Sequence, residues 1–230
     1  MPFPTVILPG YLADAAEYRS LETDLNAEYG LTVTVPVRWY DWIATIGRSV
    51  TGILHQLDAT IRQVRQQSGS SHVNLIGHSA GGWLARIYLG DRPYRLSPRM
   101  APVTWNGRSQ VATLITLGTP HTSLERWTRH NLEFVNHTYP GAFYAQDLPY
   151  ICVAGKAIRG DRRQQWFAYN SYKMTCGTGD CWGDGITPIA SAHLEGATNL
   201  TLEGATHAPK GDRRWYGSPG FREAWLPYLH

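Results

Sequence analysis

Short apolar runs, each closed by a turn residue, are the feature that most constrains the fold of this chain. Runs of this length, rich in valine, isoleucine and threonine, are typical of strands that are buried on both faces. There are six: TVILPG (5–10), LTVTVPV (31–37), HVNLIGH (72–78), VATLITLGTP (111–120), YICVAG (150–155) and NLTLEG (199–204). We therefore expect a mostly parallel six-stranded sheet, with functional loops at the carboxyl ends of its strands.

The segments between these runs follow the period of amphipathic helices. The first begins with Asp14 as N-cap and Glu17 three residues later, which is the pattern of a capping box, and continues with Tyr18, Leu21 and Leu25 as an apolar stripe. A longer one has an apolar face made of Ile46, Val50, Ile53, Leu54, Leu57, Ile61 and Val64, and a polar face made of Arg48, Gln56, Arg62, Gln63 and Gln66. Strands that alternate with helices predict an α/β fold with helices on both faces of the sheet.

The length of the chain favours one domain over residues 1–230. With 230 residues, 43% of them hydrophobic, the chain is long enough to bury one large α/β core. Three long irregular stretches interrupt the pattern, at 91–110, 121–149 and 156–198. Insertions of this length are commonly functional or covering elements, so these stretches are candidates for a cap or lid.

The charge and hydropathy of the chain limit the classes of partner and the location that we expect. The net charge of +3 comes mostly from scattered arginines, so we expect no nucleic-acid partner. The first residues carry no basic segment followed by an apolar core, and nowhere do eighteen apolar residues follow one another, so we expect neither a secretory signal nor a membrane span. We expect a cytoplasmic protein, for which peripheral contact with lipid stays open, as does the oligomeric state.

The three cysteines and the histidines do not indicate a metal. Cys152 lies in a strand-like run, whereas Cys176 and Cys181 flank a glycine-rich loop and are the only pair that could bridge. In a reducing cytoplasm, two free thiols are the simpler expectation for that pair. Two cysteines without a second pair or a histidine cluster make half of a zinc shell, so we expect neither a metal nor any other cofactor.

The stretch GHSAG (77–81) is the first that points to chemistry. It follows an expected strand and opens an expected helix, which is the strand-turn-helix setting that the G-x-S-x-G motif requires. Small residues at Gly77 and Gly81 let strand and helix approach closely at a sharp turn. A serine N-cap in a glycine-rich turn would explain Ser79 equally well, so the assignment depends on what lies downstream.

A serine hydroxyl needs a base, and that base needs an orienting carboxylate. In the order serine, acid, histidine, the chain offers Asp184 after the fifth apolar run and His207 after the sixth. Both follow the carboxyl ends of expected strands, so the fold would bring them to Ser79. Asp180, four residues before Asp184, is the alternative acid, and Asp161 is a more distant one.

With these residues in place, the chain resembles an α/β-hydrolase of the serine esterase and lipase type. The resemblance rests on VILPGYLAD, GHSAGG, LITLGTPHTS, GDGITP and GATHAP in the family's order, and is loosely nearest to lipase-like proteins of cyanobacteria and plant plastids. The antiparallel strands with which the family usually begins are missing here. The resemblance implies Ser79 as nucleophile, His207 as general base, and oxyanion donors from the amide of Ala80 and that of Tyr11 or Leu12.

The surroundings of the site are expected to be aromatic. Trp39 and Trp42 follow the second run, at the edge where the site should open, and with Leu12 they are candidates for substrate binding. Tyr11 and Trp83 are further candidates for the pocket lining. For His78, beside the serine, we expect a packing or pocket residue that points away from the catalytic histidine.

Together these features predict a carboxylic-ester hydrolase that acts on lipid-like or apolar acyl esters without a cofactor. The same three side chains would equally serve a thioesterase, an acyltransferase or a peptidase, because they do not choose the leaving group. A binding protein on a hydrolase scaffold is the non-enzymatic alternative.

Overall fold

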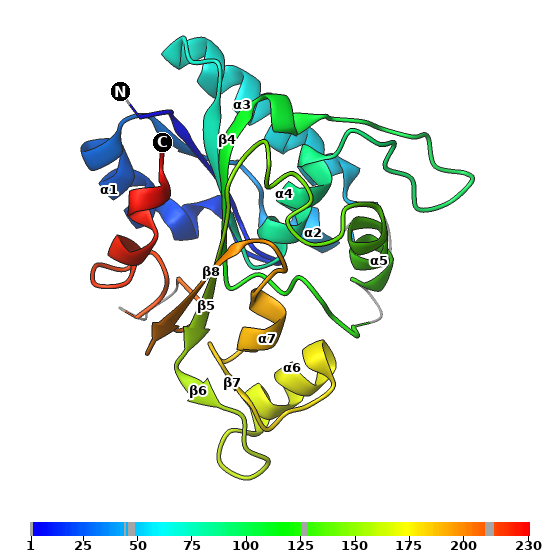
Figure 1. Ribbon diagram of the computed structural model, residues 1–230, viewed down its shortest axis with the longest axis vertical. Helices are drawn as coiled ribbons and strands as arrows, with labels where there is room; N and C mark the ends of the chain where they lie inside the picture. The colour runs from blue at the N-terminus through cyan, green and yellow to red at the C-terminus, as the bar shows by residue number, and fades with distance from the viewer. Residues whose placement is uncertain (1, 44, 46–48, 126–127, 210–213) are drawn as a thin grey trace.

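A six-stranded parallel sheet forms the centre of the molecule (Figure 1). The computed structural model describes residues 2–43, 45, 49–125, 128–209 and 214–230. The strands run in the order β2-β1-β3-β4-β5-β8. Their bounds are β1 Thr5–Leu8, β2 Thr32–Thr34, β3 Val73–His78, β4 Val111–Leu117, β5 Tyr150–Lys156 and β8 Thr198–Glu203.

All six expected strands are present, and the α/β prediction is confirmed. The fourth strand is shorter than expected because Gly118, with φ +58, turns the chain out of the sheet directly after Leu117. The register pairs Leu8 with Gly77 and His78 with Leu117. The loops after β1, β3 and β4 therefore begin side by side at one edge of the sheet.

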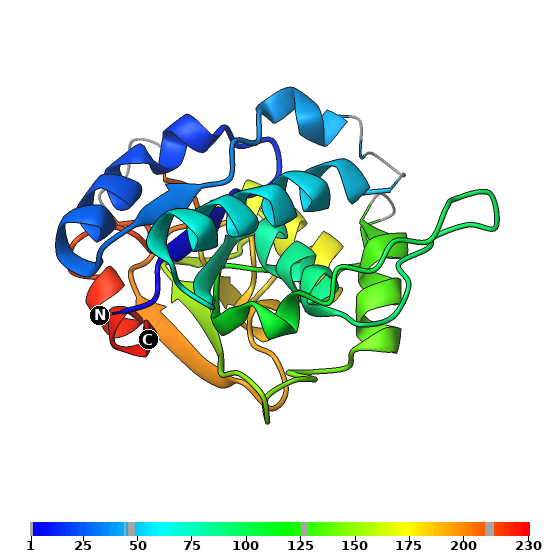
Figure 2. The ribbon, with the colours of Figure 1, turned by 90° about the horizontal axis from the view of Figure 1, so that it is seen from above.

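Helices cover both faces of this sheet, as Figure 2 shows from above. The expected first helix is a 3₁₀ turn, η1, followed by α1, and the amide of Asp14 donates to the Glu17 carboxylate over 3.1 Å. The long helix begins at Thr51, and Ile46 and Arg48 lie outside the described residues. The bounds are η1 Ala15–Tyr18, α1 Arg19–Tyr29, α2 Trp39–Ile43, α3 Thr51–Ser68, α4 Ala80–Leu89, η2 Gly107–Ser109, α5 Arg129–Thr138, α6 Trp166–Cys176, α7 Ile189–Ala192, η3 Arg222–Ala224 and η4 Leu226–Tyr228.

Alternate side chains along each strand pack into two separate hydrophobic cores, one on each face of the sheet. Val6, Leu75 and Leu114 point to the face covered by α3, α4 and α5. Ile7 and Ile76 point to the other face, which α1 and the C-terminal 3₁₀ turns cover. This alternation follows from the two-residue period of a strand and explains why the runs are apolar throughout.

The longest crossover builds a small lobe of its own. Between β5 and β8 the chain forms α6 and a two-stranded antiparallel ribbon of β6 Ile158–Arg159 and β7 Trp182–Gly183. In Figure 1 these elements extend beyond the carboxyl end of β5 and form the lower end of the molecule. Within the described ranges, no helix is both long and apolar enough to span a bilayer.

Candidate active site

Ser79 occupies a sharp bend between β3 and α4. Its backbone has φ 51 and ψ −124, a left-handed conformation that costs a residue with a side chain about 1–3 kcal/mol. The bend needs glycines around it: a Cβ on Gly77 would lie 2.6 Å from the Cα of Gly82, and one on Gly81 would lie 2.4 Å from the carbonyl oxygen of Leu8. The small residues of the motif are therefore required by backbone contacts.

The structure brings Ser79, His207 and Asp184 together from three separate loops. His207 Nε2 lies 3.0 Å from the Ser79 hydroxyl, which donates to it, and His207 Nδ1 donates to Asp184 Oδ2 over 2.7 Å. The amide of His207 also donates to the carbonyl of Asp184, over 3.0 Å. Side chain and backbone together thus fix the imidazole against the carboxylate, with its other nitrogen on the serine.

Asp184 is completely buried, and four donors converge on its carboxylate. Oδ1 accepts the amides of Ile186 (2.9 Å) and Thr187 (2.6 Å), and Oδ2 accepts both His207 and the hydroxyl of Tyr216 (2.6 Å). Burial alone would raise the pKa of Asp184, but the interactions with His207, Tyr216 and the Thr187 amide hold it below the usual value. The carboxylate is therefore kept ionised beside the imidazole.

The alternative acids lie elsewhere. Asp180 is exposed on the lobe and forms an ion pair with Arg159 over 2.9 Å. Asp161 is exposed as well and accepts the amides of Arg163 and Gln164. Neither carboxylate is recorded in contact with His207.

Tyr216 is a site residue that no motif in the sequence indicates. It lies in the segment after β8, is fully buried, and its hydroxyl accepts the amide of Gly155 over 2.8 Å while donating to Asp184. Gly155 must lack a side chain here, because a Cβ would lie 2.8 Å from the Cβ of Asp184. Tyr216 thus ties the carboxylate to the end of β5.

His78 points toward His207, and the expectation that it faces away is wrong. Its ring lies 4.9 Å from the ring of His207, and its Nε2 donates to the His207 carbonyl over 2.9 Å. Its Nδ1 accepts the Tyr18 hydroxyl over 2.6 Å, and that hydroxyl accepts the amide of Gly10. Burial lowers the pKa of His78 to about 3, so this ring is neutral and cannot exchange protons with His207 near neutral pH.

A buried hydrogen-bond chain therefore runs from Gly10, through Tyr18 and His78, to the backbone of His207. This chain joins the loop after β1 to the loop that carries His207. His78 is 3% exposed, so its side chain has little access to a ligand.

The loop after β1 lies directly against Ser79. A Cβ on Gly10 would lie 2.9 Å from the Cβ of Ser79, and the amide of Ala13 donates to the Gly10 carbonyl to close a turn. Tyr11 and Leu12 are the central residues of this turn, and Leu12 has a φ of 56. On the other side of Ser79, Ala80 is the first residue of α4, where a helix leaves its amides without an intrahelical partner.

The candidate lining residues divide into exposed and buried ones. Leu12 and Trp39 are about half exposed, and Tyr11 is half-buried against the edge of the Trp42 ring. Trp42 and Trp83 are 1% and 3% exposed and belong to the core between the sheet and α3, so in this conformation they present almost no surface to a ligand. The core, which needs large apolar groups beneath the loops, accounts for their presence.

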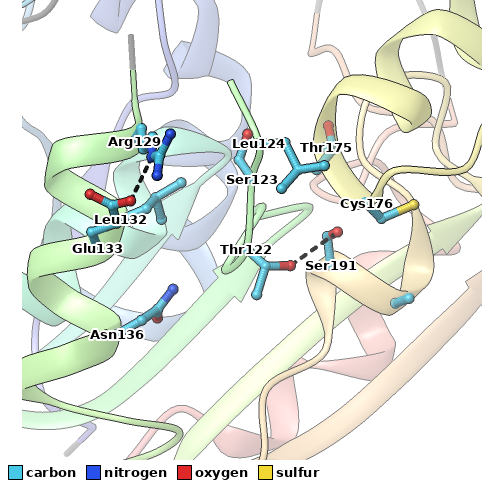
Figure 3. A pocket seen from close by; sticks show the side chains of 11 residues that line it. Thr122, Ser123, Leu124, Arg129, Leu132, Glu133, Asn136, Thr175, Cys176 and Ser191 are labelled. Atoms are coloured by element: carbon cyan, nitrogen blue, oxygen red, sulfur yellow. Dashed lines mark hydrogen bonds and ion pairs between the residues drawn. The ribbon is translucent and has the colours of Figure 1, made fainter. Parts of the chain in front are cut away.

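A cavity of about 560 Å³ opens between the loop after β4, α5, the end of α6 and α7 (Figure 3). The hydroxyl of Thr122 donates to that of Ser191 over 3.3 Å on its wall. Its wall is Thr122, Ser123, Leu124, Arg129, Leu132, Glu133, Asn136, Thr175, Cys176, Ala190 and Ser191. None of the three triad side chains belongs to this wall.

The described residues contain no group of three or more histidine, cysteine or acidic side chains that could hold a metal ion. The three cysteines are free thiols. Cys176 and Cys181 lie together around the loop, and both donate to the carbonyl of Thr178.

Comparison with known proteins agrees with this architecture. The model of the family described as "PGAP1-like alpha/beta domain" matches residues 39–139, which include Ser79 but neither Asp184 nor His207. No curated protein matches the sequence significantly.

Solved structures are similar in fold at low sequence identity. Phospholipase PlaB from Legionella pneumophila is 15% identical with a TM-score of 0.60; the match covers 91% of this chain, which spans only 54% of PlaB. Est1E from Butyrivibrio proteoclasticus is 13% identical (TM-score 0.53, 99% and 88% of the two chains). The esterase EaEST from Exiguobacterium antarcticum is 16% identical (TM-score 0.50, 98% and 91%).

Proposed function

We propose that this chain, which has the fold of the α/β-hydrolase superfamily, hydrolyses carboxylic esters through an acyl-enzyme on Ser79. The observation that carries the proposal is the continuous hydrogen-bonded series from the Ser79 hydroxyl through His207 to a buried, ionised Asp184. A binding protein would have no need to keep an acid, a base and a hydroxyl in this order.

In the first step, the Ser79 oxygen attacks the ester carbonyl while His207 Nε2 takes its proton. Asp184 holds the imidazole in the tautomer that leaves Nε2 free and stabilises the imidazolium that forms. The oxygen of the tetrahedral intermediate lies between the amide of Ala80 and an amide of the Gly10–Ala13 turn, that of Tyr11 or Leu12. Each such donor contributes on the order of 3 kcal/mol to the stability of the transition state.

In the second step, His207 returns the proton to the leaving alcohol, and the acyl group stays on Ser79. A water molecule, deprotonated by the same Nε2, then attacks the acyl-enzyme and restores the serine. The exposed apolar side chains of Leu12 and Trp39 near this edge favour lipid-like or apolar acyl esters. Each acyl methylene that they bury adds about 0.8 kcal/mol to binding.

The test compares Ser79→Ala with Ser71→Ala on short p-nitrophenyl esters. Ser71 is a matched control, because it is an exposed serine whose hydroxyl lies 2.9 Å from Nδ1 of His72, and among the described residues no carboxylate forms a hydrogen bond or ion pair with that ring. Ser79→Ala should lower kcat by about 10⁴-fold or more, and Ser71→Ala should leave it unchanged. Turnover that survives Ser79→Ala would refute the mechanism, and a panel that includes thioesters and peptides separates esterase activity from the other acyl transfers.

A further inference from the structure

The exposed large apolar side chains collect at the edge of the sheet that carries the site. Among the described residues, all of them except Phe143 lie between the carboxyl end of a strand and the end of the first α-helix or ribbon strand after it, whereas Phe143 follows α5 on the return to β5. These are Leu12 after β1, Trp39, Tyr40 and Ile43 after β2, Leu124 after β4, and Trp166, Phe167, Met174 and Trp182 after β5. Core packing does not account for such side chains, since each is at least 43% exposed.

Helix α6 carries the densest part of this set. Its buried positions, such as Ala168, Tyr172 and Thr175, repeat every three or four residues and face the molecule. Its outward face carries Trp166 and Phe167, with exposures of 62% and 59%, and Met174 about two turns further. The polar Asn170 and the cationic Lys173 are exposed on the same side. The helix thus presents three large apolar side chains, mixed with one amide and one cation, on the side that the rest of the chain leaves uncovered.

Cations surround this apolar face. Residues 156–182 hold five lysines and arginines against two aspartates. Lys156 and Arg159 have acidic partners. Arg162 donates to the hydroxyl of Tyr169 over 2.7 Å and lies over its ring, whereas Arg163 and Lys173 are exposed. Within the described part of the chain, none of these three cations forms an ion pair. Asp180 forms an ion pair with Arg159, and Asp161 accepts hydrogen bonds from two backbone amides.

Leu124 joins the end of α6 to the loop after β4. The amide of Leu124 donates to the carbonyl of Met174, and its side chain is exposed and borders the cavity of Figure 3. The loop after β4 begins beside the candidate site, because the amide of Ser79 donates to the carbonyl of Leu117 at the end of β4. This loop therefore links the end of α6 to the edge of the sheet that holds Ser79.

We infer that the outward face of α6, with Trp166, Phe167 and Met174 flanked by Arg162, Arg163 and Lys173, docks on the surface of an anionic lipid bilayer. Tryptophan and phenylalanine insert at the depth of the headgroups, while lysine and arginine pair with anionic lipids beside them. The lobe is one end of the molecule (Figure 1), so a planar bilayer can meet it without touching α1 or α3. The docking would present lipid esters to the edge of the sheet that holds Ser79, and this role rests on the proposed function.

The test is co-sedimentation with sucrose-loaded vesicles of phosphatidylcholine, with or without one third phosphatidylglycerol, performed on the Ser79→Ala protein and on the wild type. Both should bind the anionic vesicles more tightly than the neutral ones, and high NaCl should weaken that binding. Arg163→Gln/Lys173→Gln should weaken it on the order of 30-fold, since each cation near an anionic surface contributes roughly fivefold. Trp166→Ser/Phe167→Ser should weaken it on the order of tenfold.

Matched controls lie outside the lobe. Phe143→Ser removes the exposed aromatic that precedes β5, and Arg19→Gln/Arg92→Gln removes two exposed cations from other segments. These variants should bind like the wild type. In the background that keeps Ser79, the α6 variants and the control variants should all retain the wild-type thermal unfolding and turnover of a soluble p-nitrophenyl ester.

Equal binding of the α6 variants and the wild type, or no preference for anionic vesicles, would overturn the docking proposal, as would self-association through this face without vesicle binding. Hydrolysis of soluble ester without vesicle binding refutes docking alone, whereas vesicle binding without any hydrolysis refutes the proposed function alone.

Discussion

Replacing Tyr216 by phenylalanine tests whether the carboxylate of Asp184 is held ionised by its neighbours. The substitution keeps the buried ring and removes only the hydroxyl, which donates to Asp184 Oδ2 over 2.6 Å and accepts the amide of Gly155 over 2.8 Å. A hydrogen bond to a charged group contributes about 1.5–3 kcal/mol, and the Gly155 amide is also left without its acceptor. We expect the free energy of unfolding to fall by about 3 kcal/mol near neutral pH.

The dependence on pH follows from the direction of the Asp184 shift. The pKa of Asp184 in the folded protein lies below its unfolded value of about 3.9, so its ionisation stabilises the fold above that pH. This contribution is lost as the pH falls through the folded-state pKa. Removing the Tyr216 hydroxyl raises the folded-state pKa toward the unfolded one, so the difference between variant and wild type should shrink on acidification.

The assay is urea unfolding at neutral pH and near pH 3, with Tyr172→Phe as the control. Tyr172 is also buried near Asp184, but its hydroxyl donates to the Ile158 carbonyl and accepts the amide of Gly185, which are both neutral. Loss of the Tyr172 hydroxyl should lower the free energy of unfolding by about the same amount at both pH values. A Tyr216→Phe penalty that is equally independent of pH would refute the account of Asp184.

Three further substitutions test other parts of the site. Asp184→Asn should lower kcat about 10⁴-fold by favouring the wrong imidazole tautomer. Asp180→Asn should change kcat less than about twofold, as expected for an exposed ion pair. Steady-state ester kinetics measure both, and a larger loss of kcat in Asp180→Asn than in Asp184→Asn would contradict the assignment of the acid. His78→Gln keeps a donor and an acceptor but does not titrate. The pKa of His78 falls from 6.5 to about 3 on folding, so the free energy of unfolding of the wild type should decline as the pH drops below about 6.5. Urea unfolding over a pH series should show a smaller decline in His78→Gln, and an equal decline in both proteins would contradict the burial of a neutral His78. Gly81→Ala places a Cβ 2.4 Å from the Leu8 carbonyl oxygen, so we expect a loss of about 2 kcal/mol or more in thermal unfolding, and an unchanged Tm would contradict the tight approach of β1 and α4.

The sheet and the bend at Ser79 were predictable because their signals are local. Apolar runs of four to eight residues, separated by helical periods, specify strands and helices without knowledge of their neighbours. The carboxyl ends of parallel strands meet at one edge, which is why three residues in separate loops could be proposed as one site. Gly77 is equally local, since it is set by the contact between β3 and the helix that follows, whereas Gly81 is set by the carbonyl of Leu8 at the end of β1.

The remainder of the site depends on contacts that no local pattern encodes. Tyr216 lies in a segment without a helical or strand period, and its path back to Asp184 is set by the packing of Trp225 and Leu226 against the face of α1. A signal did exist for His78: it lies two residues after Ile76, so the strand period places both on the same face as α1. The position of Trp42 after a strand suggested a substrate-binding residue, but an aromatic side chain there is equally suited to the core beneath the loop, where Trp42 lies.

Covalent labelling tests whether Ser79 is the nucleophile that His207 activates. The protein is treated with a fluorophosphonate, digested, and mapped by mass spectrometry, beside His207→Gln and Ser79→Ala. We expect one phosphonyl group on the peptide that contains Ser79, strongly slowed labelling in His207→Gln and none in Ser79→Ala. Labelling of a different residue, or equal labelling of Ser79 in His207→Gln, would contradict this mechanism.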